Sequence, residues 1–181
     1  MNLLARRNAN PVKKRDENPD DRHDMTNGAS LTAARITAAV ARLFLDHGNA
    51  CIREFTVRTG RRADLMVLGP KRDITIIEVK SSRQDFTSDQ KWQEYIEWAD
   101  RFYFAVAEDF PRDILPGPDI CGIIITDGFD CHIVQEAPAS KLAGTRRTHL
   151  VTRLAHVAMR RLEWAAQDNP DNAKADDRAE E

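Results

Sequence analysis

Two stretches decide the fold: Arg62-Ala63-Asp64-Leu65-Met66-Val67-Leu68 and Ile74-Thr75-Ile76-Ile77-Glu78-Val79-Lys80. Both are rich in β-formers, and the segment between them, Gly69-Pro70-Lys71-Arg72-Asp73, consists of turn formers. Two apolar runs around a short turn predict an antiparallel β-hairpin. The turn length favours a register in which position 68 faces 74 and position 66 faces 76.

In this register Asp64 lies directly opposite Glu78. Side chains alternate between the two faces of a strand, so Glu78 and Lys80 share a face while Val79 points away. An ordinary solvated edge with a cross-strand salt bridge would also explain these residues. However, the strand Ile74–Val79 is apolar on both faces, which is typical of a buried central strand. Charges at the end of such a strand are costly unless they are paired or bind a ligand.

Two carboxylates beside an ammonium suit a divalent-metal nuclease. Mg²⁺ prefers oxygen ligands, so Asp64 and Glu78 are the predicted metal ligands, with the Val79 main-chain carbonyl as a third. Mg²⁺ or Mn²⁺ would activate water for phosphodiester hydrolysis. Lys80 would orient that water or stabilise the charge on the transition state. Asp64, Glu78 and Lys80 are therefore the predicted catalytic residues.

The two ends of the chain differ in composition from the middle. Residues 1–28 are polar without apolar periodicity, and residues 167–181 hold six acids against two bases. Both are predicted to be disordered tails around one domain over residues 29–166. That domain holds 19 basic and 18 acidic residues, so it is nearly neutral. Any DNA-binding surface must therefore be a local patch.

Cysteine usage and hydropathy predict a cytoplasmic protein. Cys51, Cys121 and Cys131 are odd in number and lie in apolar, strand-like contexts, so we expect reduced thiols. There is no apolar run long enough for a transmembrane helix or a signal peptide, so no membrane association is expected.

Periodicity and turn residues place the other elements. Ser30 is the predicted N-cap of a helix over Leu31–His47, which Gly48 would end. The polar segment Ser81–Asp89 is predicted to be a loop close to the carboxylates. The remaining expectations are strands over Cys51–Thr59, Arg101–Ala107, Gly122–Thr126 and Cys131–Gln135, helices over Asp89–Ala99 and Arg147–Ala166, and a loop with a turn of helix over Asp109–Asp119. This order predicts an α/β domain whose central mixed sheet is flanked by helices.

With these elements in place, the chain resembles the PD-(D/E)XK nuclease superfamily. The motif stands as Asp64 and Glu78-Val79-Lys80, with Ala63 at the position of the name-giving proline. A closer resemblance is to the MmcB-like family of bacterial DNA-repair proteins, over roughly Leu31–Leu162. It rests on four stretches: Gly60-Arg61-Arg62-Ala63-Asp64, Glu78-Val79-Lys80-Ser81-Ser82, Asp85-Phe86 and Lys91-Trp92-Gln93-Glu94-Tyr95.

The resemblance implies a restriction-endonuclease-like core, a helix, three strands, a helix and a strand, followed here by a β-hairpin and a C-terminal helix. It also implies a role in DNA damage, with DNA and other repair proteins as partners. The fold alone does not establish catalysis. A DNA-binding or scaffold module without turnover is therefore the alternative function. A homodimer would be attractive, because one site cuts one strand.

The chain departs from the superfamily pattern at two places. Many members carry Gln-X-X-X-Tyr on the second helix, where this chain has Lys91-X-X-X-Tyr95. Lys91 would contact a phosphate as a point charge. Many members also place a metal-linked acid on the first helix, where Leu31–Leu45 has none. Glu54 would replace it if position 56 pairs with 64; a surface acid beside Arg53 or Arg62 is the alternative.

Several basic and polar residues are candidates for binding the DNA backbone. Arg58, Arg61 and Arg62 flank the mouth of the hairpin, where they would either clamp a phosphate or form a solvated turn. Ser82, Arg83 and Lys91 surround the end of the Glu78 strand, and Lys91 is placed on the first turn of the expected second helix.

Other side chains have a structural interpretation beside the functional one. Asp85 is either a loop acid or a partner of Lys80 or Lys91. Trp92 and Tyr95 are favoured as core residues over stacking on bases. In the last helix the predicted inner stripe is Leu150, Leu154, Val157, Ala158 and Leu162. Its arginines, Arg146, Arg147, Arg153, Arg160 and Arg161, are interpreted as a solvated surface spread over several faces, with a DNA track as the minority view.

Overall fold

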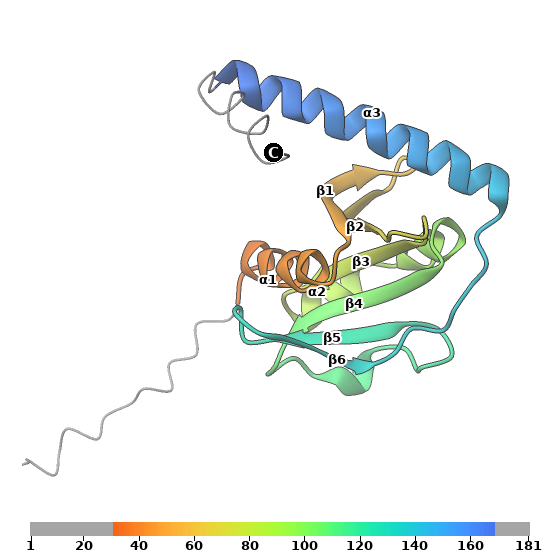
Figure 1. Cartoon of the computed structure of the whole chain (residues 1–181). Coiled ribbons are helices and arrows are strands. Elements are labelled where there is room, and N and C mark those ends of the chain that lie inside the picture. The colour runs from red at the N-terminus through yellow and green to blue at the C-terminus, as the bar shows by residue number, and fades with distance from the viewer. Residues whose placement is uncertain (1–30, 169–181) are drawn as a thin grey trace, which may run out of the picture.

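Six strands form one sheet in the computed structural model, which describes residues 31–168. They are β1 (Ala50–Thr56), β2 (Arg62–Leu68), β3 (Ile74–Lys80), β4 (Arg101–Ala107), β5 (Gly122–Thr126) and β6 (Cys131–Gln135). The strands lie in chain order across the sheet (Figure 1). Neighbours are antiparallel from β1 to β3, parallel from β3 to β5, and antiparallel between β5 and β6. The predicted mixed sheet with flanking helices is confirmed, and β2 to β6 have their predicted bounds.

The β2–β3 hairpin has the predicted register, with Leu68 paired to Ile74 and Met66 to Ile76. All seven residues of β3 are buried. This strand lies between β2 and β4 in the interior of the sheet, so its apolar side chains pack on both faces. The predicted central strand is confirmed, and the two charged residues at its end are buried with it.

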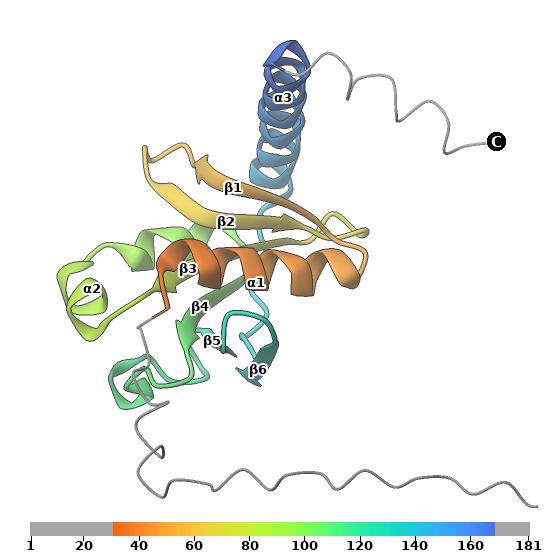
Figure 2. The same cartoon turned by 90° about the vertical axis from the view of Figure 1, so that its left-hand side faces the viewer.

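Helix α1 (Ala33–Asp46) covers one face of the sheet (Figure 2). Its buried Ile36 and Val40 pack against a cluster that includes Leu65 and Ile77. The N-cap is Thr32, whose side chain accepts a hydrogen bond from the Arg35 N–H, so the predicted cap at Ser30 is wrong. The helix stops as predicted at Gly48, where a φ of 73° suits glycine.

The opposite face is covered by two short helices where a loop and one longer helix were predicted. Arg83–Ser88 forms the α-helix α2, and Trp92–Trp98 forms the 3₁₀-helix η2. The predicted loop over Ser81–Asp89 is therefore wrong, and the helix predicted over Asp89–Ala99 is present but shorter and of the 3₁₀ type. Ser82 caps α2 by accepting a hydrogen bond from the Asp85 N–H at 3.1 Å, which favours helix over loop.

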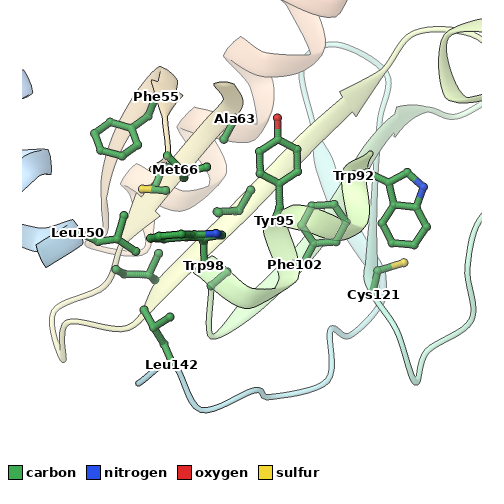
Figure 3. Close-up of a cluster of buried hydrophobic side chains, with 14 of the residues drawn as sticks. Phe55, Ala63, Met66, Trp92, Tyr95, Trp98, Phe102, Cys121, Leu142 and Leu150 are labelled. Atoms are coloured by element: carbon green, nitrogen blue, oxygen red, sulfur yellow. The ribbon is translucent and has the colours of Figure 1, made fainter. Parts of the chain in front are cut away.

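The period of η2 explains its type. Trp92, Tyr95 and Trp98 are three residues apart and all three are buried. A 3₁₀-helix has three residues per turn, so this spacing puts all three rings on one face. Figure 3 shows them in the same buried cluster as Phe102 and Leu150. The favoured interpretation of Trp92 and Tyr95 as core residues is confirmed.

Helix α3 (Gly144–Asp168) runs along the β1 side of the sheet and projects beyond it (Figures 1 and 2). Its first half packs on the core through Leu150 and Leu154. The predicted inner stripe is wrong at its far end, because Leu162 is 69% exposed. The predicted tails, 1–28 and 167–181, lie outside the described residues except for Gln167 and Asp168, which end α3.

A short loop helix, η3 (Arg112–Ile114), lies between β4 and β5, as predicted. The three cysteines are free thiols. Within residues 31–168, no helix combines the length and hydropathy needed to cross a membrane.

Candidate active site

The end of the β2–β3 hairpin brings Asp64 and Glu78 together. The Val79 N–H donates to Asp64 Oδ2 at 2.8 Å, and the Asp64 N–H donates to Glu78 Oε1 at 3.3 Å. Each carboxylate thus accepts a hydrogen bond from the backbone of the neighbouring strand. The regular pairing ends one position earlier, at Leu65 and Ile77, so the side chains continue the link between the strands. This arrangement holds both carboxylates in fixed positions.

Lys80 lies on the same face of β3 as Glu78, and each residue is 4% exposed. The Lys80 ammonium is 2.6 Å from Asp89 Oδ2 and 3.9 Å from Glu78 Oε2. Asp89 also accepts a hydrogen bond from the Lys91 N–H, so it is itself held in place. The closest ionic partner of Lys80 is therefore an acid that the sequence analysis did not select.

The sequence did carry an indirect signal for Asp89. The polar segment after β3 was expected to lie close to the carboxylates, and α2 does return Asp89 to the end of that strand. Of the two roles considered for Asp85, the structure shows the local acid and not the partner of a lysine. Its carboxylate accepts hydrogen bonds from the Ser81 N–H and hydroxyl at 3.0 and 3.3 Å and not from a lysine.

Burial controls the protonation of the carboxylate pair. Loss of solvent, followed by repulsion from Asp64, raises the pKa of Glu78 from 4.5 to about 8, although Lys80 opposes the shift. Burial also raises the pKa of Asp64, against the hydrogen bond from Val79. For Asp89, burial is outweighed by the hydrogen bond from Lys80, and its pKa is lowered. Near neutral pH the pair therefore retains a proton on Glu78.

Tyr95 links the core to the site. The residue is 5% exposed, and in Figure 3 its hydroxyl points away from the other aromatic rings of the cluster. The hydroxyl donates to the Arg62 carbonyl at 2.9 Å, two residues before Asp64. Burial, and then the charges of Glu78 and Asp64, raise the pKa of the phenol. Tyr95 therefore positions the start of β2.

Comparison with known proteins identifies the family. The sequence profile described as DNA repair protein MmcB-like matches residues 20–169. The chain belongs to the MmcB-like DNA repair family. A search of curated proteins found no match.

The family assignment has a structural counterpart. One solved structure, described as "SPO1766 protein of unknown function from Silicibacter pomeroyi", matches with 44% sequence identity and a TM-score of 0.69. The match covers 77% of this chain and 92% of that one. The MmcB-like assignment supports a role in DNA repair, while the structural relative adds the fold and no activity.

In this MmcB-like chain, Glu54 does not join the carboxylate pair. The condition for that role, a pairing of 56 with 64, is not met, because Thr56 pairs with Arg62. Glu54 has a φ of 50°, and its side chain is 63% exposed and ion-paired with Arg62 at 3.4 Å. This is the surface-acid alternative. In residues 31–168 no three acidic, histidine or cysteine side chains form a metal-binding group.

The predicted DNA-binding residues fall into two groups. Arg61 and Arg62 are ion-paired with Glu94 and Glu54, and Ser82 caps α2. The other three, Arg58, Arg83 and Lys91, are exposed. Lys91 immediately precedes the short η2 and does not lie within it, and its contact with a phosphate stays a prediction.

Proposed function

We propose that this MmcB-like protein is a divalent-metal-dependent deoxyribonuclease of the PD-(D/E)XK type that acts in DNA repair. One observation supports the proposal most strongly: the Asp64 and Glu78 carboxylates each accept a hydrogen bond from the backbone of the other residue's strand. The two carboxylates lie beside Lys80 at the end of β3, which is fully buried. The half-buried Asp64 raises the pKa of the buried Glu78 and lowers stability, so a fold that needed only an ion pair would gain nothing from the second acid.

The donor set fits a hard cation. Asp64 and Glu78 would hold Mg²⁺ or Mn²⁺, with the Val79 carbonyl as a third protein oxygen. The charge on the carboxylate pair is poorly neutralised within the site, because the Lys80 ammonium is closer to Asp89, at 2.6 Å, than to Glu78, at 3.9 Å. When bound, the cation would lower the pKa of a water molecule and neutralise charge on the scissile phosphate.

The remaining chemistry belongs to the chain. Lys80 carries three N–H donors, of which Asp89 engages one at 2.6 Å. The others would donate to a phosphate oxygen or orient the attacking water. Asp89 holds the ammonium in place, and Tyr95 fixes the backbone ahead of Asp64 through the Arg62 carbonyl. Exposed Arg58, Arg83 and Lys91 would contact the DNA backbone.

The test is titration of Mg²⁺ or Mn²⁺ into wild type and Asp64→Ala with labelled nicked, flapped, single-stranded and duplex DNAs. We expect metal-dependent cleavage by wild type that the variant lacks. Asp85→Ala is the matched control, because it removes a nearby carboxylate that binds Ser81 and not the pair. Metal-dependent cleavage that survives Asp64→Ala would exclude the proposed site.

A second candidate is a DNA-binding or scaffold module without turnover. The observation that favours it is the 2.6 Å ion pair to Asp89, which engages the Lys80 ammonium. This candidate predicts salt-dependent DNA binding without product at any metal concentration. Under either function we propose DNA and other repair proteins as partners and a cytoplasmic location. As a nuclease, the protein would act as a homodimer to cut both strands.

A further inference from the structure

Three arginines and two histidines form a line along α3: Arg146, His149, Arg153, His156 and Arg160. They follow one another at alternating spacings of three and four residues, which places them on one helix face. We call this set the α3 stripe. The helix has no acidic residue between Gly144 and Leu162, so no carboxylate of its own lies within the stripe.

The stripe corrects the interpretation of these arginines as scattered. Only Arg147 and Arg161 leave it, and both have structural partners. Arg147 forms a two-pronged ion pair with Asp100, and Arg161 donates to the backbone carbonyls of Arg53 and Glu54. Arg147 and Arg161 thus hold α3 in place from outside the stripe, while within the stripe Arg146 contacts η2 through Glu97 and Trp98.

The stripe lines two adjoining hollows. The first, of about 750 Å³, is bordered by Arg146 and His149 and, across from α3, by Arg58 in the connection between β1 and β2. The second, of about 450 Å³, is bordered by His149, Arg153, His156 and Arg160. His149 belongs to both, so the hollows follow one another along the helix.

Aromatic rings hold the three guanidinium groups without neutralising them. Arg146 lies 4.7 Å from the Trp98 ring centre, Arg153 lies 5.4 Å from that of Phe55, and Arg160 lies 4.8 Å from that of Trp164. Such contacts order the planar groups while their charge stays available. In residues 31–168 the one ion pair of the stripe joins Arg146 to Glu97 at 3.6 Å, and Arg153 and Arg160 have none.

The stripe lies beside the candidate active site. Arg153 stacks on Phe55 of β1, and Phe55 pairs with Ala63, the residue before Asp64. Figures 1 and 2 both show α3 alongside β1, the edge strand of the sheet, which lies next to β2. A ligand along the stripe would therefore pass one strand away from Asp64.

We propose that the α3 stripe, together with Arg58, binds the phosphate backbone of duplex DNA and leads it to Asp64, Glu78 and Lys80. The part of this proposal that leads the DNA to Asp64, Glu78 and Lys80 rests on the proposed function. From Arg146 to Arg160 the helix rises about 21 Å. That length matches about six nucleotides of one strand, so the three arginines and two histidines can face successive phosphates. Charge complementarity selects the polyanion, and the row of planar donors suits phosphate.

The test measures binding of labelled duplex DNA to the full chain in EDTA, by fluorescence anisotropy over a range of salt concentrations. The variant Arg153→Ala/Arg160→Ala is compared with Lys71→Ala/Arg112→Ala, which removes two exposed cations from the β2–β3 turn and η3. We expect the first variant to weaken binding roughly tenfold or more at moderate salt. Its slope of log K against log[salt] should fall by about two, one per lost phosphate contact. The control should match wild type.

Further arms separate the possible failures. Arg153→Lys/Arg160→Lys keeps both charges, so recovery of most of the affinity would attribute the loss to the stripe and not to misfolding. Equal loss in the stripe variant and the control would overturn the proposal, as would a stripe variant that loses binding to poly-glutamate but not to DNA. If binding depends on the stripe but the wild-type protein never cuts DNA, the α3 stripe as a DNA-binding surface is supported and the nuclease function is rejected. If the stripe variant cuts DNA with an unchanged KM, the nuclease function is supported and the role of the stripe is rejected.

Discussion

The β2–β3 and β5–β6 hairpins belong to the same sheet, but the pKa values of their acidic residues are shifted in opposite directions. Burial raises the pKa of Glu78, at the end of β3, to about 8. Asp127 follows β5 in the other hairpin, and its pKa is lowered by hydrogen bonds from the Phe129 and Asp130 N–H groups at 2.7 and 2.8 Å. β3 is buried throughout, whereas β6 has an exposed centre. A carboxylate at a strand end thus becomes chemically unusual through burial and a like charge, not through its local sequence.

The largest expected difference between the hairpins is in catalysis. Glu78→Gln keeps the shape of the side chain but removes a metal-binding charge, so the metal-dependent cleavage rate should fall roughly 10³-fold or more. Asp127→Asn makes the same chemical change in the other hairpin and should leave the rate unchanged. Single-turnover cleavage of the preferred DNA would measure both. Equal rates in the two variants would contradict the assignment of the site to β3.

Core substitutions test the difference in packing. Ile76 in β3 is fully buried, so Ile76→Ala should lower the free energy of unfolding by about 2–5 kcal/mol, through lost burial and a cavity. Ile133 in β6 is 39% exposed, and Ile133→Ala should cost less than about 1 kcal/mol. Denaturant unfolding monitored by tryptophan fluorescence gives both values. Similar losses would mean that β6 is covered in solution.

The pH dependence of stability should carry the signature of Glu78. Its pKa is about 8 in the folded protein and near 4.5 when unfolded, so between these values the unfolded state releases a proton that the folded state keeps. Stability from Glu78 is therefore lost as the pH rises through this window, by on the order of a few kcal/mol. Denaturant melts at pH 5 and pH 8 should show a smaller fall in Glu78→Gln. An identical fall in the variant would assign the effect to other groups.

Asp127 should give the smallest effect, and of opposite sign. Its lowered pKa means that the folded state favours the ionised form, so its contribution is present above the unfolded pKa and is lost as the pH falls through the folded one. Asp127→Asn should therefore reduce the difference in stability between pH 6 and pH 3 slightly. A variant that behaves like Glu78→Gln would remove the contrast between the hairpins.

The sequence predicted one half of the site better than the other. The hairpin register and the meeting of Asp64 with Glu78 follow from turn chemistry and the two-residue period of strands, both of which are local. The Lys80 ammonium lies closer to Asp89 than to Glu78 of its own strand, because α2 turns the chain back. Glu54 misses the site because its φ of 50° interrupts the pairing of β1 with β2 at that residue. These departures depend on contacts between segments, which no period in the sequence reports.

The sequence by itself determined the boundaries of the five strands from β2 to β6, the β2–β3 hairpin and the identity of the paired acids. Alternating side-chain polarity and turn-forming residues are properties of consecutive residues, so they can be found without the tertiary structure. Only the tertiary structure decided that Glu78 is buried while Asp64 is half-buried, that Asp89 holds Lys80, and that the stripe on α3 lies beside β1. Burial and pKa depend on which elements cover which face of the sheet, and that arrangement is a property of the whole packed chain.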